Sequence, residues 1–442
     1  MSKKILGVIL ACAMFATAGC GAKSTGKTES KPADNAAAES TVTTESVKEE
    51  AAATESAAPA DESGADASKA EEEKYELEYW TEGSPVVASI EAYVADVTDE
   101  KSEHFIPVED RIAVFDLDGT IIGELYPSYF EYMMFIHRAL YDDTYEAPED
   151  MKEFAKALEE GIATGQMPEG NELKHATYAG QAYSGMTIDE LKEYTREFMK
   201  SEADGFTNLT RGEGFYKPMV SMVKYLDAND FQCYIVSGSD RTVVRALIEN
   251  KLPIPENRVI GMSYSMVATG EGEEDGLEYQ YKEDDAVVLG GDLLIKTIKM
   301  NKVSEIELEI GKVPVLSFGN SSGDLSMDQY VFNNDKYESK VYMVLCDDLE
   351  REHGNMEKAD SMKATCEEHG YETISMRDDF ATIYGDDVKI QPYSFEAATE
   401  SAAEAAPAAE AEAAPAAEAE AAAEEPAAEE TAAEEEVLDA AA

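Results

Sequence analysis

Residues 112–120 read Ile-Ala-Val-Phe-Asp-Leu-Asp-Gly-Thr, an apolar run that leads directly into two acids. The apolar part predicts a strand, and residues two apart on a strand point the same way. Asp116 and Asp118 therefore both face the crevice at the carboxyl end of that strand, where α/β sheets bind their ligands. Gly119 permits the tight turn that follows.

Short apolar runs and amphipathic stretches continue to alternate through residues 76–395. Strands are predicted at 111–115, 232–236, 258–261, 313–318 and 340–345, and helices at 215–229 and 240–250. Strands that alternate with helices are typical of a parallel sheet with helices on both faces. The pattern therefore predicts an α/β fold with a Rossmann-like sheet.

The gap between the first two predicted strands is too long for a single crossover helix. Helical periods recur within it, at 127–140, 148–161 and 187–201. We therefore expect an inserted helical cap domain over about residues 121–210. Residues 264–290 combine Gly-rich and acidic segments and predict a hairpin or loop insertion.

Charge limits the partners of this chain. Its 442 residues carry 36 Lys and Arg against 93 Asp and Glu, a formal net charge of −57. Non-specific binding of nucleic acid needs basic residues that replace phosphate counterions, so we expect no nucleic-acid partner. An anionic membrane surface would also repel the chain unless a covalent anchor held it there.

Both flanks of the predicted folded part have low-complexity compositions. Residues 21–75 contain almost no large apolar side chain, so they predict a disordered acidic linker. Residues 396–442 predict a disordered Ala/Glu/Pro tail.

Residues 1–20 have the features of an export signal, with two lysines followed by a short apolar stretch. The sequence Thr-Ala-Gly-Cys at 17–20 resembles the lipobox of bacterial lipoproteins, although Thr17 stands where that family usually has Leu. The resemblance implies an exported lipoprotein on the outer face of the cell membrane, anchored by lipid on Cys20. A plain secretory signal is the alternative.

Three cysteines remain beyond this signal, namely Cys233, Cys346 and Cys366. Their spacing does not match a zinc site. Cys233 lies in an apolar run and is expected to be buried. A disulfide between Cys346 and Cys366 is left open.

Two further predicted strands end in polar residues. The run 233–236 leads into Ser237 and Gly238, and the run 315–318 leads into a segment that contains Asn320 and Asp324. A helix is expected after Gly238, and helix N-termini favour anions.

Together, these segments resemble the motifs of the haloacid dehalogenase superfamily, most of whose members are magnesium-dependent phosphohydrolases. The similarity covers most of residues 78–385 and is closest to an exported lipoprotein subgroup of the phosphoserine-phosphatase-like branch. It implies that Asp116 attacks phosphorus, that Asp118 acts as acid and base, and that Ser237 binds the phosphoryl oxygens. A lysine completes such sites, and Lys302 fits better than Lys296.

The same resemblance implies a Mg²⁺ site. Its ligands would be Asp116, Asp118, Asn320 and Asp324. Asn320 departs from the family, which usually has Asp at this position, but an amide oxygen can still coordinate Mg²⁺. The charge of these residues also favours a metal ion. Without a divalent cation, the three carboxylates would repel a phosphate dianion bound beside them.

Substrate contacts are expected from Thr120, Gly238 and Glu124. In phosphoserine phosphatases a Glu near the position of Glu124 meets the substrate amine. With Tyr126, Tyr129 and Tyr132, it could bind a cationic alcohol by charge and cation–π contact. The alternative is that these tyrosines belong to the core of a cap helix.

We therefore expect a phosphatase that acts through an aspartyl-phosphate on small external phosphate esters, with no protein partner indicated. Narrow activity on phosphorylcholine or phosphoserine, and phosphotransfer to another alcohol, are alternatives within this class. A non-catalytic surface module that binds a ligand on the same fold is an alternative of another class.

Overall fold

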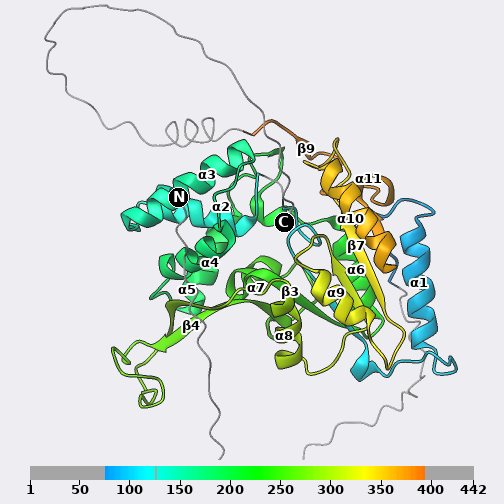
Figure 1. The fold of residues 1–442 in the computed structure, drawn as a ribbon, viewed down its shortest axis with the longest axis horizontal. Coiled ribbons are helices and arrows are strands. Elements are labelled where there is room, and N and C mark those ends of the chain that lie inside the picture. Colours follow the sequence, from blue (N-terminus) through cyan, green and yellow to red (C-terminus); the bar gives the residue numbers. More distant parts are fainter. Residues whose placement is uncertain (1–74, 125–126, 394–442) are drawn as a thin grey trace, which may run out of the picture. The chain divides into compact units, whose positions relative to one another are not determined.

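The computed structural model describes residues 75–124 and 127–393 (Figure 1). The predicted signal peptide with Cys20, nearly all of the predicted linker, the predicted tail and Tyr126 lie outside the described residues.

A seven-stranded sheet forms the centre of the fold, in the order β5-β4-β3-β1-β6-β7-β8. Its strands are β1 (Ile112–Phe115), β3 (Gln232–Asp240), β4 (Val259–Ala268), β5 (Val287–Ile295), β6 (Leu316–Gly319), β7 (Lys340–Leu345) and β8 (Glu372–Ser375). Neighbouring strands pair in parallel except β4 and β5, which pair antiparallel at one edge. The short strands β2 (Phe206–Thr207) and β9 (Lys389–Ile390) form a separate antiparallel pair.

The helices are α1 (Pro85–Thr98), α2 (Phe130–Ile136), α3 (Glu149–Thr164), α4 (Asn171–Ala182), α5 (Ile188–Met199), α6 (Lys217–Ala228), α7 (Arg241–Ile248), α8 (Met300–Glu309), α9 (Leu325–Phe332), α10 (Met356–His369) and α11 (Met376–Asp379). Short 3-10 turns span Val108–Asp110, Arg211–Glu213 and Glu256–Arg258. A π-helical turn, His137–Tyr141, continues α2.

Helices cover both faces of the sheet, because the side chains of each strand alternate between two cores. Val114 and Val236 pack on one face with apolar residues of α8, α9 and α10. Phe115 and Ile235 pack on the other with residues of α1, α6 and α7. The predicted α/β class with a mostly parallel sheet and two helical layers is therefore confirmed.

Four helices, α2 to α5, lie between β1 and β2 in the chain, ahead of α6 and β3. All seven residues of α2 are buried, and α2 contacts α3 and α4. This segment is the region for which the sequence predicts an inserted cap.

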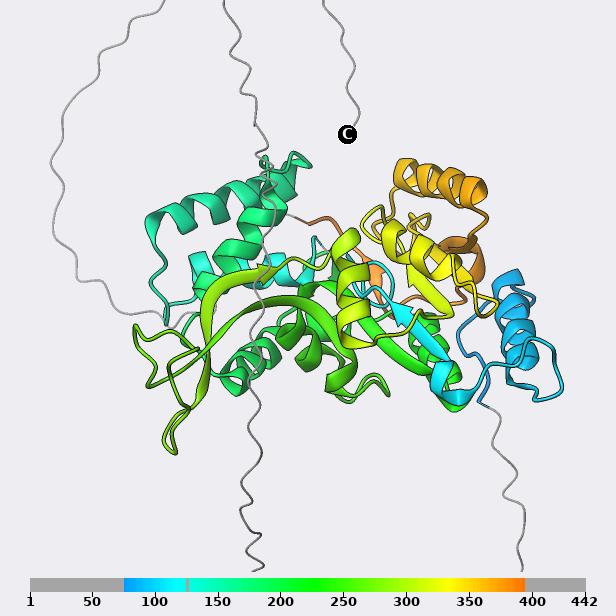
Figure 2. The same ribbon diagram turned by 60° about the horizontal axis from the view of Figure 1, so that its bottom comes forward.

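Residues 264–290 belong to a hairpin in which β4 is much longer than its predicted four residues. The second half of β4 lies beyond the parallel sheet and pairs with β5, and Figure 2 shows this arm extending alongside the inserted helices. The hydroxyl of Tyr264 donates to the Ala176 carbonyl of α4 at 2.9 Å, which links the arm to the insertion.

The disulfide left open by the sequence is not present. Cys346 and Cys366 are free thiols, and both are buried, as is Cys233. Within residues 75–124 and 127–393, no helix has the length and apolar character needed to span a membrane.

Candidate active site

A cavity of about 100 Å³ opens at the carboxyl ends of β1, β3 and β6. Its wall contains the predicted site residues Asp116, Asp118, Glu124, Gly238, Lys302, Asn320 and Asp324. It also contains Tyr129, Glu131, Tyr132, Glu172, Ser239, Lys296, Ile298, Ser321 and Gly323. The predicted contacts Thr120 and Ser237 are buried but do not line this cavity.

Lys302 joins the two carboxylates at the base of the cavity. Its side chain is buried, and Nζ lies 2.6 Å from Asp116 Oδ1 and 2.8 Å from Asp324 Oδ1. Nζ also donates to the Val236 carbonyl at 2.6 Å, so its three N–H groups all have acceptors. Of the two candidate lysines, Lys302 is therefore the one placed against Asp116.

Lys296 occupies a different part of the cavity, where its Nζ donates to the Gly238 carbonyl at 2.7 Å. Gly238 lies near the end of β3, which continues to Asp240 through the segment that the sequence predicts as a phosphate-binding turn. Both lysines thus supply positive charge, but to different parts of the wall.

Asp116 follows β1 and is held by its backbone, whose N–H donates to the Phe318 carbonyl of β6 at 2.8 Å. Burial and the charge of Asp324 raise the pKa of Asp116. Burial also acts on Asp324, but the charge and hydrogen bond of Lys302 outweigh it and lower the pKa of Asp324. With Oδ1 engaged by Lys302, Oδ2 is the oxygen of Asp116 that remains available for chemistry.

Asp118 has a serine partner that was missed in the sequence. Ser239 Oγ donates to Asp118 Oδ2 at 2.8 Å, and the backbone N–H of Ser239 donates to Ser237 Oγ at 3.0 Å. Burial raises the pKa of Asp118 to about 6, which suits a group that must both give and take a proton near neutral pH. Ser237 thus supports Ser239 from beneath the cavity. The only available signal was the repeated Ser in Ser-Gly-Ser at the end of β3.

The turn after β6 shapes the other side of the site. Asp324 Oδ2 accepts hydrogen bonds from the backbone N–H groups of Asn320 and Ser321, both at 3.0 Å. Asn320 Nδ2 donates to Glu124 Oε2 at 2.6 Å. This bond orients the amide so that Oδ1, the atom that can bind a cation, lies on the side opposite Glu124.

Glu124 lines the cavity, where it is expected to contact a substrate amine, and it also has two protein partners. Its Oε2 accepts from Asn320 Nδ2, and its Oε1 forms a partly buried ion pair with Lys358 of α10. We infer from these contacts that Glu124 positions Asn320. Each carboxylate oxygen can accept a second hydrogen bond, so the contact of Glu124 with a substrate amine stays a prediction. Lys358 lies 234 residues further along the chain, and no local pattern indicated this pair.

Gly119 allows this arrangement by having no side chain. Its φ is +79°, and an added Cβ would lie 2.0 Å from Asn320 Nδ2 and 2.4 Å from Glu124 Oε2. Any larger residue would have to displace the Asn320–Glu124 pair.

We expect Gly119→Ala to lower turnover at least tenfold because it moves Asn320. Gly83→Ala is a matched control, since Gly83 has φ +81° and nothing within 4 Å of an added Cβ. Both variants should lose about 1 kcal/mol of stability from the left-handed backbone. Chemical denaturation and steady-state kinetics of the two proteins would measure this. Equal turnover of the two variants would contradict the role given to Gly119.

The inserted helices supply the outer wall. Tyr129 and Tyr132 meet edge to face with ring centroids 5.2 Å apart, and Glu131 and Glu172 lie beside them. Burial raises the pKa of Glu131 to about 8, and its Oε1 accepts the N–H of Asp240 at 3.2 Å. Tyr132 is buried whereas Tyr129 is about one-third exposed, so the tyrosines serve both the core and the cavity.

No family model and no curated protein matches this chain. Among solved structures, it is similar to a conserved functionally unknown protein from Anaerococcus prevotii DSM 20548, with 15% identity and a TM-score of 0.40 over 66% of this chain and 91% of that one. It is also similar to cytosolic 5'-nucleotidase IIIB bound to cytidine, with 16% identity and a TM-score of 0.37 over 62% and 82%. A phosphoserine phosphohydrolase-like protein from Francisella tularensis subsp. tularensis SCHU S4 matches with 15% identity and a TM-score of 0.31 over 57% and 92%. These similarities are distant, so the chemistry of the site has to be judged from its own side chains.

Proposed function

We propose that this chain is a Mg²⁺-dependent phosphomonoester hydrolase of the haloacid dehalogenase superfamily. One observation carries the proposal. Two acids at the end of a buried strand face a cavity in which a buried lysine joins the first acid to Asp324. This combination offers a nucleophile, an acid–base group and a fixed positive charge within one small site.

Asp116 is the proposed nucleophile. Its Oδ2 attacks phosphorus while Lys302 holds Oδ1, and the bond between phosphorus and the alcohol oxygen breaks. Asp118 gives its proton to the departing alcohol and then takes a proton from the water that hydrolyses the aspartyl-phosphate. Ser239 keeps the Asp118 carboxyl group in position for both transfers.

The donor set fits Mg²⁺, which prefers hard oxygen ligands. Asp116, Asp118, Asn320 and Asp324 would hold the ion, with Asn320 already oriented by Glu124. Bound Mg²⁺ would supply positive charge against the phosphoryl oxygens. Without it, the acids that line the cavity outnumber Lys296 and Lys302 and would oppose a phosphate dianion.

Small esters are the proposed substrates. A cavity of about 100 Å³ is well below the roughly 300–1,000 Å³ of sites that enclose drug-sized ligands. The Tyr129–Tyr132 pair and the nearby Glu172 favour a cationic alcohol, such as that of phosphorylcholine or phosphoserine, as the second candidate. Phosphotransfer to another alcohol would use the same chemistry.

We also propose export and lipid anchoring at Cys20, which rest on the sequence of residues 1–20 alone. An anchored enzyme of this kind would meet phosphate esters outside the cell.

Phosphate release from p-nitrophenyl phosphate, phosphorylcholine and phosphoserine, with Mg²⁺ or with EDTA, tests the proposal. We expect turnover with Mg²⁺, loss of turnover in EDTA and recovery when excess Mg²⁺ is restored. Absence of turnover on every ester would contradict the phosphatase proposal. Binding without turnover would instead support the non-catalytic module.

A further inference from the structure

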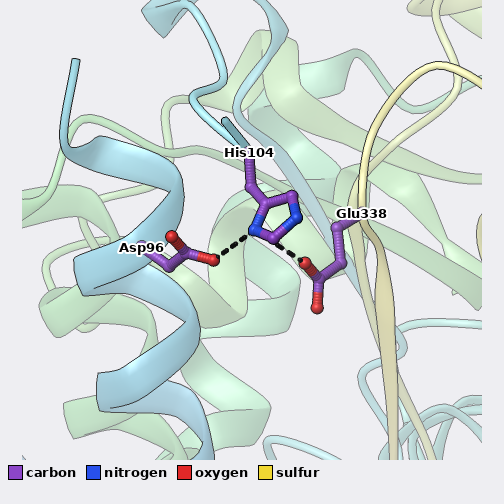
Figure 3. Close-up of side chains that lie close together, drawn as sticks. All are labelled: Asp96, His104 and Glu338. Carbon is purple, nitrogen blue, oxygen red and sulfur yellow. Dashed lines mark hydrogen bonds and ion pairs between the residues drawn. The ribbon is translucent and has the colours of Figure 1, made fainter. Parts of the chain in front are cut away.

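We propose that Asp96, His104 and Glu338 form a second metal site, which takes a divalent transition-metal ion. The three residues come from the C-terminal half of α1, the connection that follows it and the connection before β7 (Figure 3). None of them lines the cavity of the candidate active site.

Three ligand atoms converge in this cluster. His104 Nδ1 lies 2.7 Å from Asp96 Oδ2 and 3.5 Å from Glu338 Oε2, and all three atoms lie within 4.8 Å of one another. Nitrogen and oxygen ligands lie about 2.0–2.2 Å from Zn²⁺, so two ligands of one ion are at most about 4.4 Å apart. Glu338 has about half of its side chain exposed, so a small rotation brings its oxygen into range.

Among the described residues, no lysine or arginine balances the charge of the two carboxylates in this cluster. Over residues 75–124 and 127–393, neither Asp96 nor Glu338 forms an ion pair with Lys or Arg. His104 Nδ1 therefore faces two carboxylates. A proton on this nitrogen can form a short, well-aligned hydrogen bond with only one of them. A divalent cation would bind the nitrogen lone pair and neutralise both carboxylates.

Supporting contacts hold the ligands in place before any ion binds. The Ser102 hydroxyl donates to Asp96 Oδ1, which leaves Oδ2 for His104. The backbone N–H of His104 donates to Ser102 Oγ at 3.0 Å. On the other side, Tyr93, one turn before Asp96 on α1, donates its hydroxyl to the Glu338 carbonyl at 2.9 Å. Such contacts around the ligands tune metal affinity in proteins.

The ligand types indicate which ions fit. An imidazole with two carboxylates suits first-row transition ions, whereas Mg²⁺ and Ca²⁺ prefer sites made only of oxygen. A bound ion would join α1 to the connection before β7 and so tie the first helix to the sheet. This role differs from that of the Mg²⁺ proposed at Asp116.

Calorimetric titration of the full chain with Zn²⁺, in excess Mg²⁺ to occupy the other site, tests the proposal. We expect His104→Ala, Asp96→Asn and Glu338→Gln each to weaken one Zn²⁺-binding event by more than about tenfold. The control His369→Ala removes another exposed histidine, which lies at the end of α10, and should bind Zn²⁺ as the wild type does.

Thermal unfolding gives a second readout. Zn²⁺ should raise the Tm of the wild type and of His369→Ala but not that of His104→Ala. Absence of Zn²⁺ binding to the wild type, or equal binding by the wild type and the three site variants, would overturn the proposal. The side chain of Glu338 is about half exposed, so we expect Glu338→Gln to fold. Weaker Zn²⁺ binding by this variant can therefore be assigned to the lost ligand, even if another variant does not fold.

Discussion

Asp116→Asn is expected to lower turnover of phosphate esters by at least about 10⁴-fold, because an amide cannot attack phosphorus as a carboxylate does. The fold should persist, since Asn keeps the size of the side chain and Lys302 retains Asp324 and the Val236 carbonyl as partners. Steady-state kinetics with p-nitrophenyl phosphate in Mg²⁺, together with circular dichroism, would measure both properties.

Asp328→Asn is the matched control for this loss. Asp328 is also buried and lies four residues after Asp324, but it does not line the cavity, and its Oδ1 accepts from Ser317 Oγ at 2.6 Å. Burial raises the pKa of Asp328 well above its usual range, and Asn keeps the size of this side chain. A comparable loss in both variants would contradict a specific role for Asp116.

Lys302→Met is expected to have the largest effect on stability, a loss of about 3–5 kcal/mol. Removal of the ammonium leaves Asp116 and Asp324 buried side by side without their shared cation. Turnover should fall as well, because the phosphoryl oxygens lose a fixed positive charge. Chemical denaturation in EDTA would measure the stability change without any contribution from Mg²⁺.

Two further variants test the cause of that loss. Lys312→Met removes a half-exposed lysine that pairs with Asp110, and such surface pairs contribute only about 0–1 kcal/mol. In the double variant Asp116→Asn/Lys302→Met one of the two unpaired charges is absent, so the loss should be smaller than the sum of the two single losses. Strict additivity would show that repulsion between the buried acids is not the cause.

The central strands could be predicted because their signals are local. Residues of β1, β3, β6 and β7 form short apolar runs, and the structure has strands at all four. The second half of β4 carried no apolar run of this kind, although residues 264–290 predicted a hairpin or loop insertion. This half pairs with β5, and most of its residues are partly or fully exposed. Antiparallel pairing of this kind depends on tertiary contacts, which cannot be predicted from the sequence of one strand alone.

In the candidate active site, too, residues with a local sequence signal could be predicted and those joined only by tertiary contacts could not. Asp116 and Asp118 follow directly from the end of β1, and Lys302 could be proposed only through a family resemblance, because it lies 186 residues from Asp116. The pairing of Glu124 with Asn320 and Lys358 could not be predicted. It brings together three segments that are far apart in the chain, and it gives Glu124 a contact with Asn320 that the sequence did not indicate.

The formation of an aspartyl-phosphate on Asp116 is the central claim, and trapping it is the most direct test. The wild type would be mixed with p-nitrophenyl phosphate and Mg²⁺, quenched in acid during turnover, and analysed by peptide mass spectrometry. We predict one added phosphoryl group on the peptide that contains Asp116, and none on the same peptide of Asp116→Asn. Turnover by the wild type with the phosphoryl group on another residue, or undiminished turnover by Asp116→Asn, would contradict the proposed mechanism.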